Sequence, residues 1–390
     1  MRSLPIRLVA LVAVVALAAA CSDDSDASSG AATTAAPTTV TPTTAAPITA
    51  APTTAAPTTA TPTTAAPLDA RFEEVVPGGD CQCADGSEFS FWVKEADPAK
   101  VLFYFQGGGA CFSKETCAFQ GGTYKVRADG DDPNTLGEGI FDQGNEANPF
   151  LGWSVVYVPY CTGDVHMGNG EHDYGDGLVI QHRGYVNGLA ARDELVARFP
   201  SAEQVVVTGE SAGGVPTPLF AGLTGDELPD ADITAIADSS GAYPELGPLN
   251  AAIGGLWGTM NAVPDWPQNE GMTVERWSIP GLFVQAGTHD PDITMARHDY
   301  AFDIVQAQFS ALAGISADNL VALIDQNEEM IEAESVPVTG YLAPGDAHTV
   351  FSQPGFFTEE VAGVRLVEWV QGLVDGDDVV DVRCTDCRTP

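Results

Sequence analysis

Residues 205–214 constrain the fold of this chain more than any other segment. They read Val-Val-Val-Thr-Gly-Glu-Ser-Ala-Gly-Gly, so that a run of β-branched residues leads directly into a serine with glycines on both sides. The β-branched run favours a buried strand, and the glycines permit a turn too tight for larger residues. This is the nucleophile-elbow pattern, in which a strand delivers a serine hydroxyl to the rim of a sheet and a helix follows. We therefore predict that Ser211 is a nucleophile.

Other apolar runs predict the rest of the sheet. Short runs bounded by glycine or proline are typical of parallel strands buried on both faces, and they occur at 100–105, 155–160, 205–207, 233–237, 282–285 and 338–342. A period of 3.6 predicts helices over 185–199 and 359–373. The alternation favours a doubly wound, mostly parallel α/β sheet of the α/β-hydrolase type, with helices on both faces and a small cap insertion. Pro216 and Pro218 predict a distorted helix after the serine.

The first 68 residues of the chain have a different composition. Residues 1–21 carry Arg2 and Arg7, then an apolar stretch, and end in Ala-Ala-Ala-Cys21. This order predicts a signal peptide of the lipobox kind with Cys21 lipidated, and ordinary secretion after cleavage at Ala20 is the alternative. Residues 22–68 repeat Thr, Ala and Pro with few bulky apolar residues, which predicts a disordered stalk. We expect a catalytic domain over 69–390, either anchored at the cell surface or secreted.

The charge of the chain limits its partners. The 54 acidic residues against 16 basic ones give a formal net charge of −38. Such a surplus argues against binding to nucleic acid or to anionic membranes, and it would repel a polyanionic glycan at low salt. We therefore expect membrane association through the N-terminal lipid alone.

A serine nucleophile needs a base and a carboxylate that orients the base. In this fold the chain order is serine, acid, histidine, each after a strand. Of the histidines, His289, His298 and His348 follow Ser211. We predict that His348 is the base, because a short loop connects it to the strand expected at 338–342. His289 is disfavoured because its strand normally carries the acid.

The acid is expected after the strand at 282–285. Asp290 is nearest to the end of that strand and is our prediction, whereas Asp292 competes closely with it. Asp238, after the strand at 233–237, is a weaker candidate. The sequence thus predicts a Ser211–His348–Asp290 triad.

An oxyanion site requires backbone N–H donors close to the serine. One is expected from Ala212, which follows the nucleophile. The other is expected from the Gly-Gly-Gly run after the strand at 100–105, where residues without side chains let amides approach a substrate. We assign these donors to Gly108 and Gly109.

Seven cysteines follow Cys21. In an exported chain they favour disulfides, and the odd number leaves one thiol unpaired. The Cys-x-Cys and Cys-x-x-Cys spacings also permit a zinc site, which the export signal disfavours. His166, His172 and Asp173 form only a loose metal-like group. We expect neither metal nor cofactor.

Several blocks together resemble the pectin acetylesterase and Notum-like family of α/β hydrolases. The resemblance spans about 80–390. It is carried by Phe-Gln-Gly-Gly-Gly-Ala-Cys111 with Cys117, by Asn148-Pro-Phe, by Val-Pro-Tyr-Cys161-Thr-Gly-Asp164-Val-His166, by Gly184-Tyr-Val-Asn with the elbow, by His348-Thr-Val-Phe and by Glu368-Trp-Val-Gln.

The resemblance implies hydrolysis of carboxylic esters, often removal of small acyl groups from a glycan or a protein, without a metal or cofactor. It implies a disulfide between Cys111 and Cys117 and another between Cys83 and Cys161. It further suggests that Asp164 and His166 face the substrate. Apart from the resemblance, the tail Cys384-Thr-Asp-Cys387 offers a partner for Cys81, which would leave one sulfur over.

Two departures from the family pattern stand out. Glu210 occupies a position where the family usually has a small residue or cysteine, and an extra carboxylate there would raise the pKa of the base. The acid loop reads His-Asp-Pro-Asp instead of an aspartate followed shortly by glutamine, so the acid is uncertain between Asp290 and Asp292.

The glycine- and proline-rich insertion contains Trp257, Trp266 and Trp277. These rings would stack on sugars, line an acyl pocket or form the core of a cap, and Trp257 is our candidate for substrate contact. The sequence thus predicts an exported serine esterase acting on small O-acyl groups such as acetyl, on a small ester or an O-acylated glycan. A lipid or polyester hydrolase and a non-catalytic surface-binding lipoprotein remain alternatives.

Overall fold

The computed structural model describes residues 70–387. The predicted signal peptide, the lipidation site Cys21 and the stalk lie outside these residues. No helix within the described part of the chain has the length and apolar character that a membrane crossing requires.

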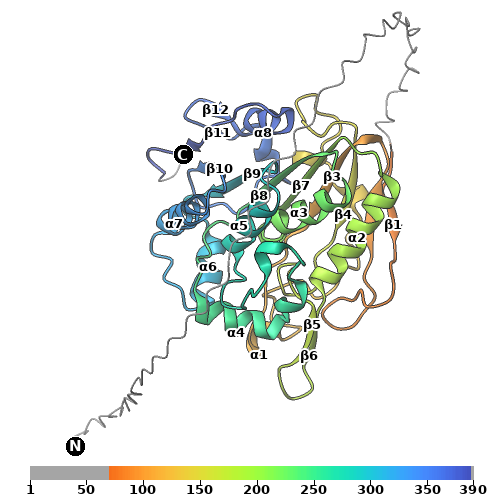
Figure 1. Ribbon diagram of the computed structural model, residues 1–390, viewed down its shortest axis with the longest axis vertical. Helices are drawn as coiled ribbons and strands as arrows, with labels where there is room; N and C mark the ends of the chain where they lie inside the picture. The colour runs from red at the N-terminus through yellow and green to blue at the C-terminus, as the bar shows by residue number, and fades with distance from the viewer. Residues whose placement is uncertain (1–69, 388–390) are drawn as a thin grey trace, which may run out of the picture. The chain divides into compact units, whose positions relative to one another are not determined.

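A mostly parallel sheet of nine strands forms the centre of residues 70–387 (Figure 1). Its order is β1-β2-β4-β3-β7-β8-β9-β10-β13. All neighbours from β4 to β13 are parallel, whereas β2 runs antiparallel to both β1 and β4. The strands are β1 (Glu73–Val75), β2 (Phe91–Lys94), β3 (Asp97–Phe105), β4 (Trp153–Val158), β7 (Gln204–Glu210), β8 (Asp232–Asp238), β9 (Thr294–Tyr300), β10 (Thr339–Ala343) and β13 (Val382–Arg383).

Eight α-helices accompany the sheet within residues 70–387. They are α1 (Lys114–Cys117), α2 (Gly184–Arg198), α3 (Thr217–Glu227), α4 (Gly247–Trp257), α5 (Ile279–His289), α6 (Ile304–Leu312), α7 (Leu320–Ala333) and α8 (Leu366–Asp375). Two small hairpins, β5 (Gly170–Asp173) with β6 (Val179–His182) and β11 (Glu360–Val361) with β12 (Val364–Arg365), complete the fold. The predicted α/β-hydrolase-like architecture is confirmed.

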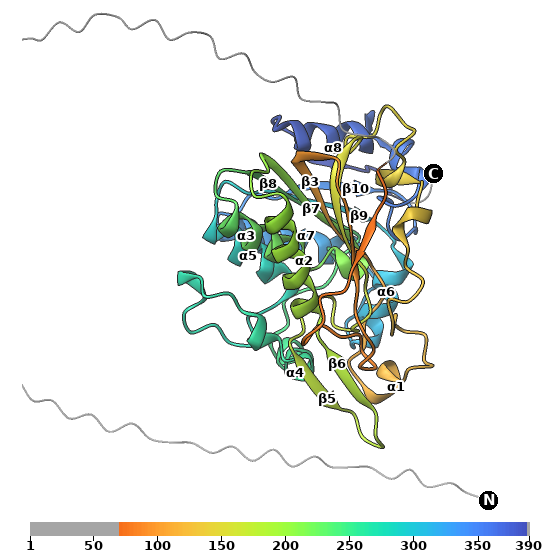
Figure 2. The ribbon, with the colours of Figure 1, turned by 90° about the vertical axis from the view of Figure 1, so that its right-hand side faces the viewer.

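Each face of the sheet has its own core because side chains alternate along a strand. On β3, Val101, Phe103 and Phe105 pack with apolar residues of α2, α3 and α5. Leu102 and Tyr104 point to the opposite face and join a cluster that includes α8. Figure 2 shows α2, α3 and α5 together on one side of the sheet. All five of these β3 side chains are almost completely buried, so replacing one of the phenylalanines with alanine would cost about 3–5 kcal/mol.

The prediction of a strand at 282–285 is wrong. These residues lie inside α5, where every residue from Pro280 to Ala286 is buried. A short run that is apolar on all sides cannot distinguish a buried helix from a buried strand. The distinguishing signal was Ser278, whose hydroxyl accepts from the Gly281 amide as an N-cap, followed by Pro280 in the first turn.

The missing strand is β9, which reads Thr-Met-Ala-Arg-His-Asp-Tyr. Six of its seven residues are buried, including Arg297, His298 and Asp299. Its charged residues concealed it, because a strand between two sheet neighbours normally reads as apolar.

Two further regions differ in detail from the sequence prediction. The helix after the elbow is divided: Ser211–Gly213 forms one 3₁₀ turn, and α3 begins only at Thr217 with Pro218 in its first turn. The region expected as a single helix over 359–373 starts with the hairpin β11–β12, and α8 covers only its second half. Ala362 and Gly363 both have positive φ, which suits a tight hairpin turn.

Three disulfides are present in the described residues. The pairs Cys83–Cys161 and Cys111–Cys117 confirm the pairing that the family resemblance implied. The expected link between Cys81 and the C-terminal cysteines is wrong, because Cys384 pairs with Cys387 three residues away and Cys81 is a free, buried thiol.

Candidate active site

The backbone at Ser211 has the geometry of a nucleophile elbow. Ser211 follows β7 directly and has a φ of 55°, a strained conformation for a residue with a side chain. The turn permits no side chain at Gly209 or Gly213, since a Cβ atom there would lie 2.3 Å from the Gly213 oxygen or 2.0 Å from the Phe105 oxygen. The sequence therefore specifies this turn locally, through its glycines.

His348 lies in the loop after β10 and is paired with a buried carboxylate. Its Nδ1 atom is 2.7 Å from Oδ2 of Asp303, whose side chain is completely buried. Oδ1 of Asp303 accepts from the backbone amides of Val305 and Gln306 as the N-cap of α6, and Nε2 of Gln306 donates to Oδ2. These bonds fix the carboxylate that orients the imidazole.

The opposite end of the imidazole is available. Nε2 of His348 is buried and has no hydrogen-bond partner among residues 70–387. A neutral imidazole that donates its Nδ1 proton to a carboxylate presents a lone pair on Nε2, as a general base requires. Ser211 and His348 both follow the carboxyl ends of sheet strands, β7 and β10, where ligands bind in this fold.

The predicted acid Asp290 does not lie beside His348. It is the C-cap of α5 and precedes β9, so it lies at the opposite edge of the sheet from Asp303, which follows β9. Asp292 lies in the same loop, and its amide donates to Asp290. The error follows from assigning the strand to 282–285. The signal for Asp303 was its position directly before the apolar run of α6, where aspartate is a preferred N-cap.

His289 and Asp238 have other partners. Nε2 of His289 lies 2.6 Å from Oδ1 of Asp226, and its ring stacks on Trp266. Asp238 does lie at the carboxyl edge, but it contacts His298 and the backbone after His348.

The predicted oxyanion loop follows β3 and passes close to the elbow. A Cβ atom on Gly107 would lie 3.0 Å from Cβ of Ser211, and Gly109 has a φ of +80°. Gly109 and Ala212 line the cavity at Ser211, whereas Gly108 packs against Tyr160 and Lys125. The amides of Gly108 and Gly109 donate to no residue within 70–387, and of the two glycines only Gly109 lines the cavity.

Asp164 and His166, predicted to face the substrate, are buried beneath this loop and do not line the cavity. Nε2 of His166 lies 3.0 Å from the backbone oxygen of Gln106, the residue before the glycine run. Burial lowers the pKa of His166 to about 4, so the neutral ring donates to that oxygen. Asp164 accepts from the amides of His166 and Gly184, and burial raises its pKa to about 6. His166 therefore contacts the start of the loop, and Asp164 holds the backbone at His166.

A large apolar cavity opens at Ser211. Its empty volume, including the open mouth, is about 910 Å³. The insertion between β8 and β9 supplies much of its wall through α4, as the predicted cap would. Other lining residues include Phe112, Val165, Met167, Leu249, Ile253, Trp257, Trp277, Phe309 and Ile315. Trp257 lines the cavity, and its indole N–H donates to the Cys111 oxygen.

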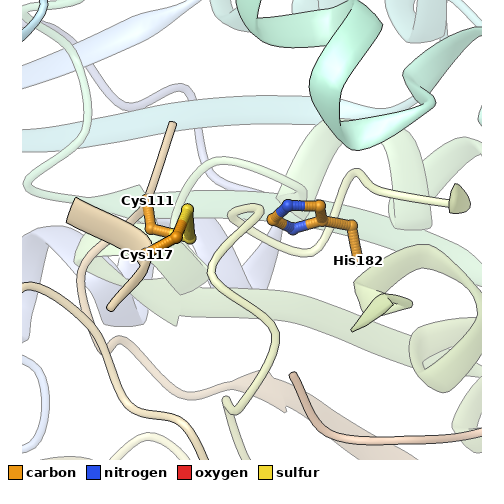
Figure 3. Close-up of side chains that lie close together, drawn as sticks. All are labelled: Cys111, Cys117 and His182. Carbon is orange, nitrogen blue, oxygen red and sulfur yellow. A yellow bond between two sulfur atoms is a disulfide. The ribbon is translucent and has the colours of Figure 1, made fainter. Parts of the chain in front are cut away.

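Cys111, Cys117 and His182 lie close together, as Figure 3 shows. The two sulfur atoms form a disulfide, which has no thiolate to offer a metal. Both ring nitrogens of His182 have partners, Thr162 O at Nδ1 and the Tyr174 hydroxyl at Nε2. This group therefore forms a packed support beside the oxyanion loop.

A serine elbow at the carboxyl edge of a doubly wound sheet, with a carboxylate–histidine pair on loops of the same edge, defines the class of α/β hydrolases. Within that class, residues 74–248 match the family model described as "Pectinacetylesterase". The matched region contains the oxyanion loop and the elbow but ends before Asp303 and His348.

Curated relatives fall into two groups. The chain is 31% identical over 137 residues to palmitoleoyl-protein carboxylesterase notum2 of Xenopus laevis, covering 34% of this chain and 28% of the relative. It is 28% identical over 173 residues to human palmitoleoyl-protein carboxylesterase NOTUM, covering 40% and 33%. It is 28% identical over 162 residues to pectin acetylesterase 5 of Arabidopsis thaliana, covering 40% and 38%. The matches thus span about a third of the length of these relatives.

Proposed function

We propose that this protein is a carboxylic-ester hydrolase that removes an acyl group through a Ser211–His348–Asp303 triad. The observation that carries the proposal is the presence of a strained, cavity-lining serine and a carboxylate-bound histidine at the same edge of the sheet. Nδ1 of that histidine faces a buried aspartate, and its Nε2 is free.

In the first half of the reaction, Nε2 of His348 takes the proton of the Ser211 hydroxyl while Oγ attacks the ester carbonyl carbon. The carbonyl oxygen becomes an oxyanion that accepts from the amide of Ala212 and from the glycine loop, at Gly108 or Gly109. Asp303 stabilises the imidazolium without taking its proton. The C–O bond to the alcohol then breaks, and the alcohol leaves with the proton from His348.

In the second half, water attacks the acyl-enzyme. His348 takes a proton from that water, and the oxyanion forms at the same amides. The bond to Oγ of Ser211 then breaks, Oγ recovers the proton from His348, and the carboxylic acid leaves. The chain's own residues supply every proton transfer in this cycle.

The size of the acyl group distinguishes two candidate functions. A small acyl group such as acetyl fits the resemblance to pectin acetylesterases. The cavity favours a longer group, since its lining is dominated by aliphatic and aromatic side chains. The relatives named palmitoleoyl-protein carboxylesterases are consistent with that second candidate. We propose an apolar acyl chain longer than acetyl, on an alcohol that remains at the mouth of the cavity, and a glycan or protein as carrier.

Export is part of the proposal. Three disulfides in the described residues are typical of proteins that fold in oxidising compartments. The predicted leader and Cys21 would place the domain at the cell surface, or outside the cell if it is secreted. The net charge of −38 disfavours anionic partners.

Hydrolysis of nitrophenyl esters from acetate to palmitate tests the proposal. We expect turnover that Ser211→Ala lowers by about 10³-fold or more, with the exposed Ser316→Ala as the matched control. An optimum at acetate would support the small-acyl candidate, and an optimum at longer chains the apolar one. Absence of Ser211-dependent turnover with every ester would favour a non-catalytic binding protein.

A further inference from the structure

The segment that follows His348 is held at four consecutive residues, three through backbone amides and one through a side chain, by residues at the ends of β7 and β8. The amide of Thr349 donates to Oγ of Ser239 at 3.0 Å. The amides of Val350 and Phe351 both donate to Oδ2 of Asp238, at 2.8 and 3.0 Å. The hydroxyl of Ser352 donates to Oε2 of Glu210 at 2.6 Å. The loop of the proposed base is thus bound to the strand that carries the nucleophile and to its neighbour.

This segment includes a strained residue. Thr349 has a φ of 62°, and a β-branched side chain rarely occupies that left-handed region. Such a conformation persists only where the surroundings impose it. The bonds at residues 349–351 impose it here, directly beside His348.

Asp238 is the centre of the arrangement. It is completely buried, and its Oδ1 accepts from Nδ1 of His298 at 2.9 Å and from Oγ of Ser239. Nε2 of His298 lies 2.9 Å from Oε1 of Glu359. Burial opposes a charge on His298, but hydrogen bonds to the two carboxylates raise its pKa to about 10. A buried cation therefore compensates the carboxylate that accepts from the loop.

We propose that Asp238, paired with His298, is a positioning residue that holds the segment after His348 in its strained backbone and thereby fixes the imidazole for proton transfer. The inference rests on the proposed esterase function. Neither Asp238 nor His298 lines the cavity, so both act through His348 and not on the substrate.

Three variants test how much each residue of the Asp238–His298–Glu359 group contributes to kcat. Asp238→Asn puts an amide nitrogen where a carboxylate oxygen accepts, and we expect kcat per folded molecule to fall about 100-fold, the effect of a displacement of about 1 Å. His298→Gln should lower kcat less, by about 10-fold. Glu359→Gln keeps an oxygen that accepts from Nε2 and should have the smallest effect. KM should change by less than about threefold in all three, because the cavity is intact.

Recovery of kcat by a second substitution distinguishes a positioning role of Asp238 from a general loss of stability. Glycine adopts a φ near +62° without strain. Thr349→Gly added to Asp238→Asn should therefore recover at least about threefold in kcat. A double variant no faster than Asp238→Asn alone would overturn the proposal.

The matched control is Glu328→Gln. It removes the partner of buried Arg297 on the same strand, β9, without touching the segment after His348. We expect its kcat within about twofold of the unmodified protein, and a loss as large as that of Asp238→Asn would show that the effect is only destabilisation. Ser211→Ala is run in parallel. If it retains activity, the esterase assignment has failed; if it is inactive while Asp238→Asn keeps its kcat, only the positioning role has failed.

Discussion

Nδ1 of His348 lies 2.7 Å from Oδ2 of Asp303, although 45 positions separate the two residues along the chain. Asp303 holds this place because β9 ends at Tyr300 and α6 begins at Ile304, so the aspartate caps the helix and orients the imidazole at once.

We predict that Asp303→Asn lowers kcat by about 10³- to 10⁴-fold, because the amide favours the wrong imidazole tautomer while the geometry is kept. Steady-state hydrolysis of a nitrophenyl ester measures the effect. Asp290→Asn is the matched control and should keep normal rates, since Asp290 lies at the other edge of the sheet. A larger loss of kcat in Asp290→Asn than in Asp303→Asn would show that Asp290 is the acid of the triad.

Gly109→Ala should abolish most of the activity. Gly109 has a φ of +80°, and a Cβ atom would lie 2.0 Å from the Thr123 oxygen, so the loop must move away from the serine. We expect a loss of about 10²- to 10³-fold in kcat, as for removal of one oxyanion donor. Gly122→Ala is the control, because its φ of +71° imposes the same strain with open space around the new methyl group. Equal losses in the two variants would point to strain alone.

The preference of the enzyme for the length of the acyl chain should depend on Ile253, which lines the cavity from α4. Ile253→Trp fills part of the space, so kcat/KM for octanoate and longer esters should fall at least about 10-fold, while acetate changes less than about threefold. Competition between acetate and octanoate esters in one reaction gives the ratio directly. A uniform loss across chain lengths would mean that the acyl group lies elsewhere.

The contribution of His298 to the stability of the fold should decrease as the pH rises from about 6.5 towards 10. The pKa of His298 is raised to about 10 in the folded state, so the proton that it holds stabilises the fold fully below the unfolded pKa of about 6.5. That contribution is lost as the pH rises through the folded pKa, by up to about 1.4 kcal/mol of unfolding free energy per pH unit.

Urea denaturation at pH 6, 7, 8 and 9 tests this slope. The free energy of unfolding should fall more steeply with pH in the unmodified protein than in His298→Gln. His172→Gln, on the β5–β6 hairpin, should parallel the unmodified protein. Parallel curves for the unmodified protein and His298→Gln would show that His298 carries no excess proton.

Sequence and structure agree at the elbow, whose strand and turn are contiguous in the chain. The strand run before Ser211 and the glycines around it specify the elbow, because no side chain fits at Gly209 or Gly213. The glycine run after β3 and the loop after β10 also lie where the sequence predicts them, near Ser211 and at the same edge of the sheet. The pairing of Cys111 with Cys117 spans only six residues.

The tertiary structure decided what depends on which residues are buried together. The sequence alone could not place Asp303, because Arg297, His298 and Asp299 made β9 resemble a surface segment, whereas all three are buried. Burial became possible only when partners from other elements compensated their charges, such as Glu328 for Arg297 and Asp238 with Glu359 for His298. One amino-acid sequence does not show which charged residues are paired in the folded protein. The free energy of burying a charge depends on the neighbours of that charge in space.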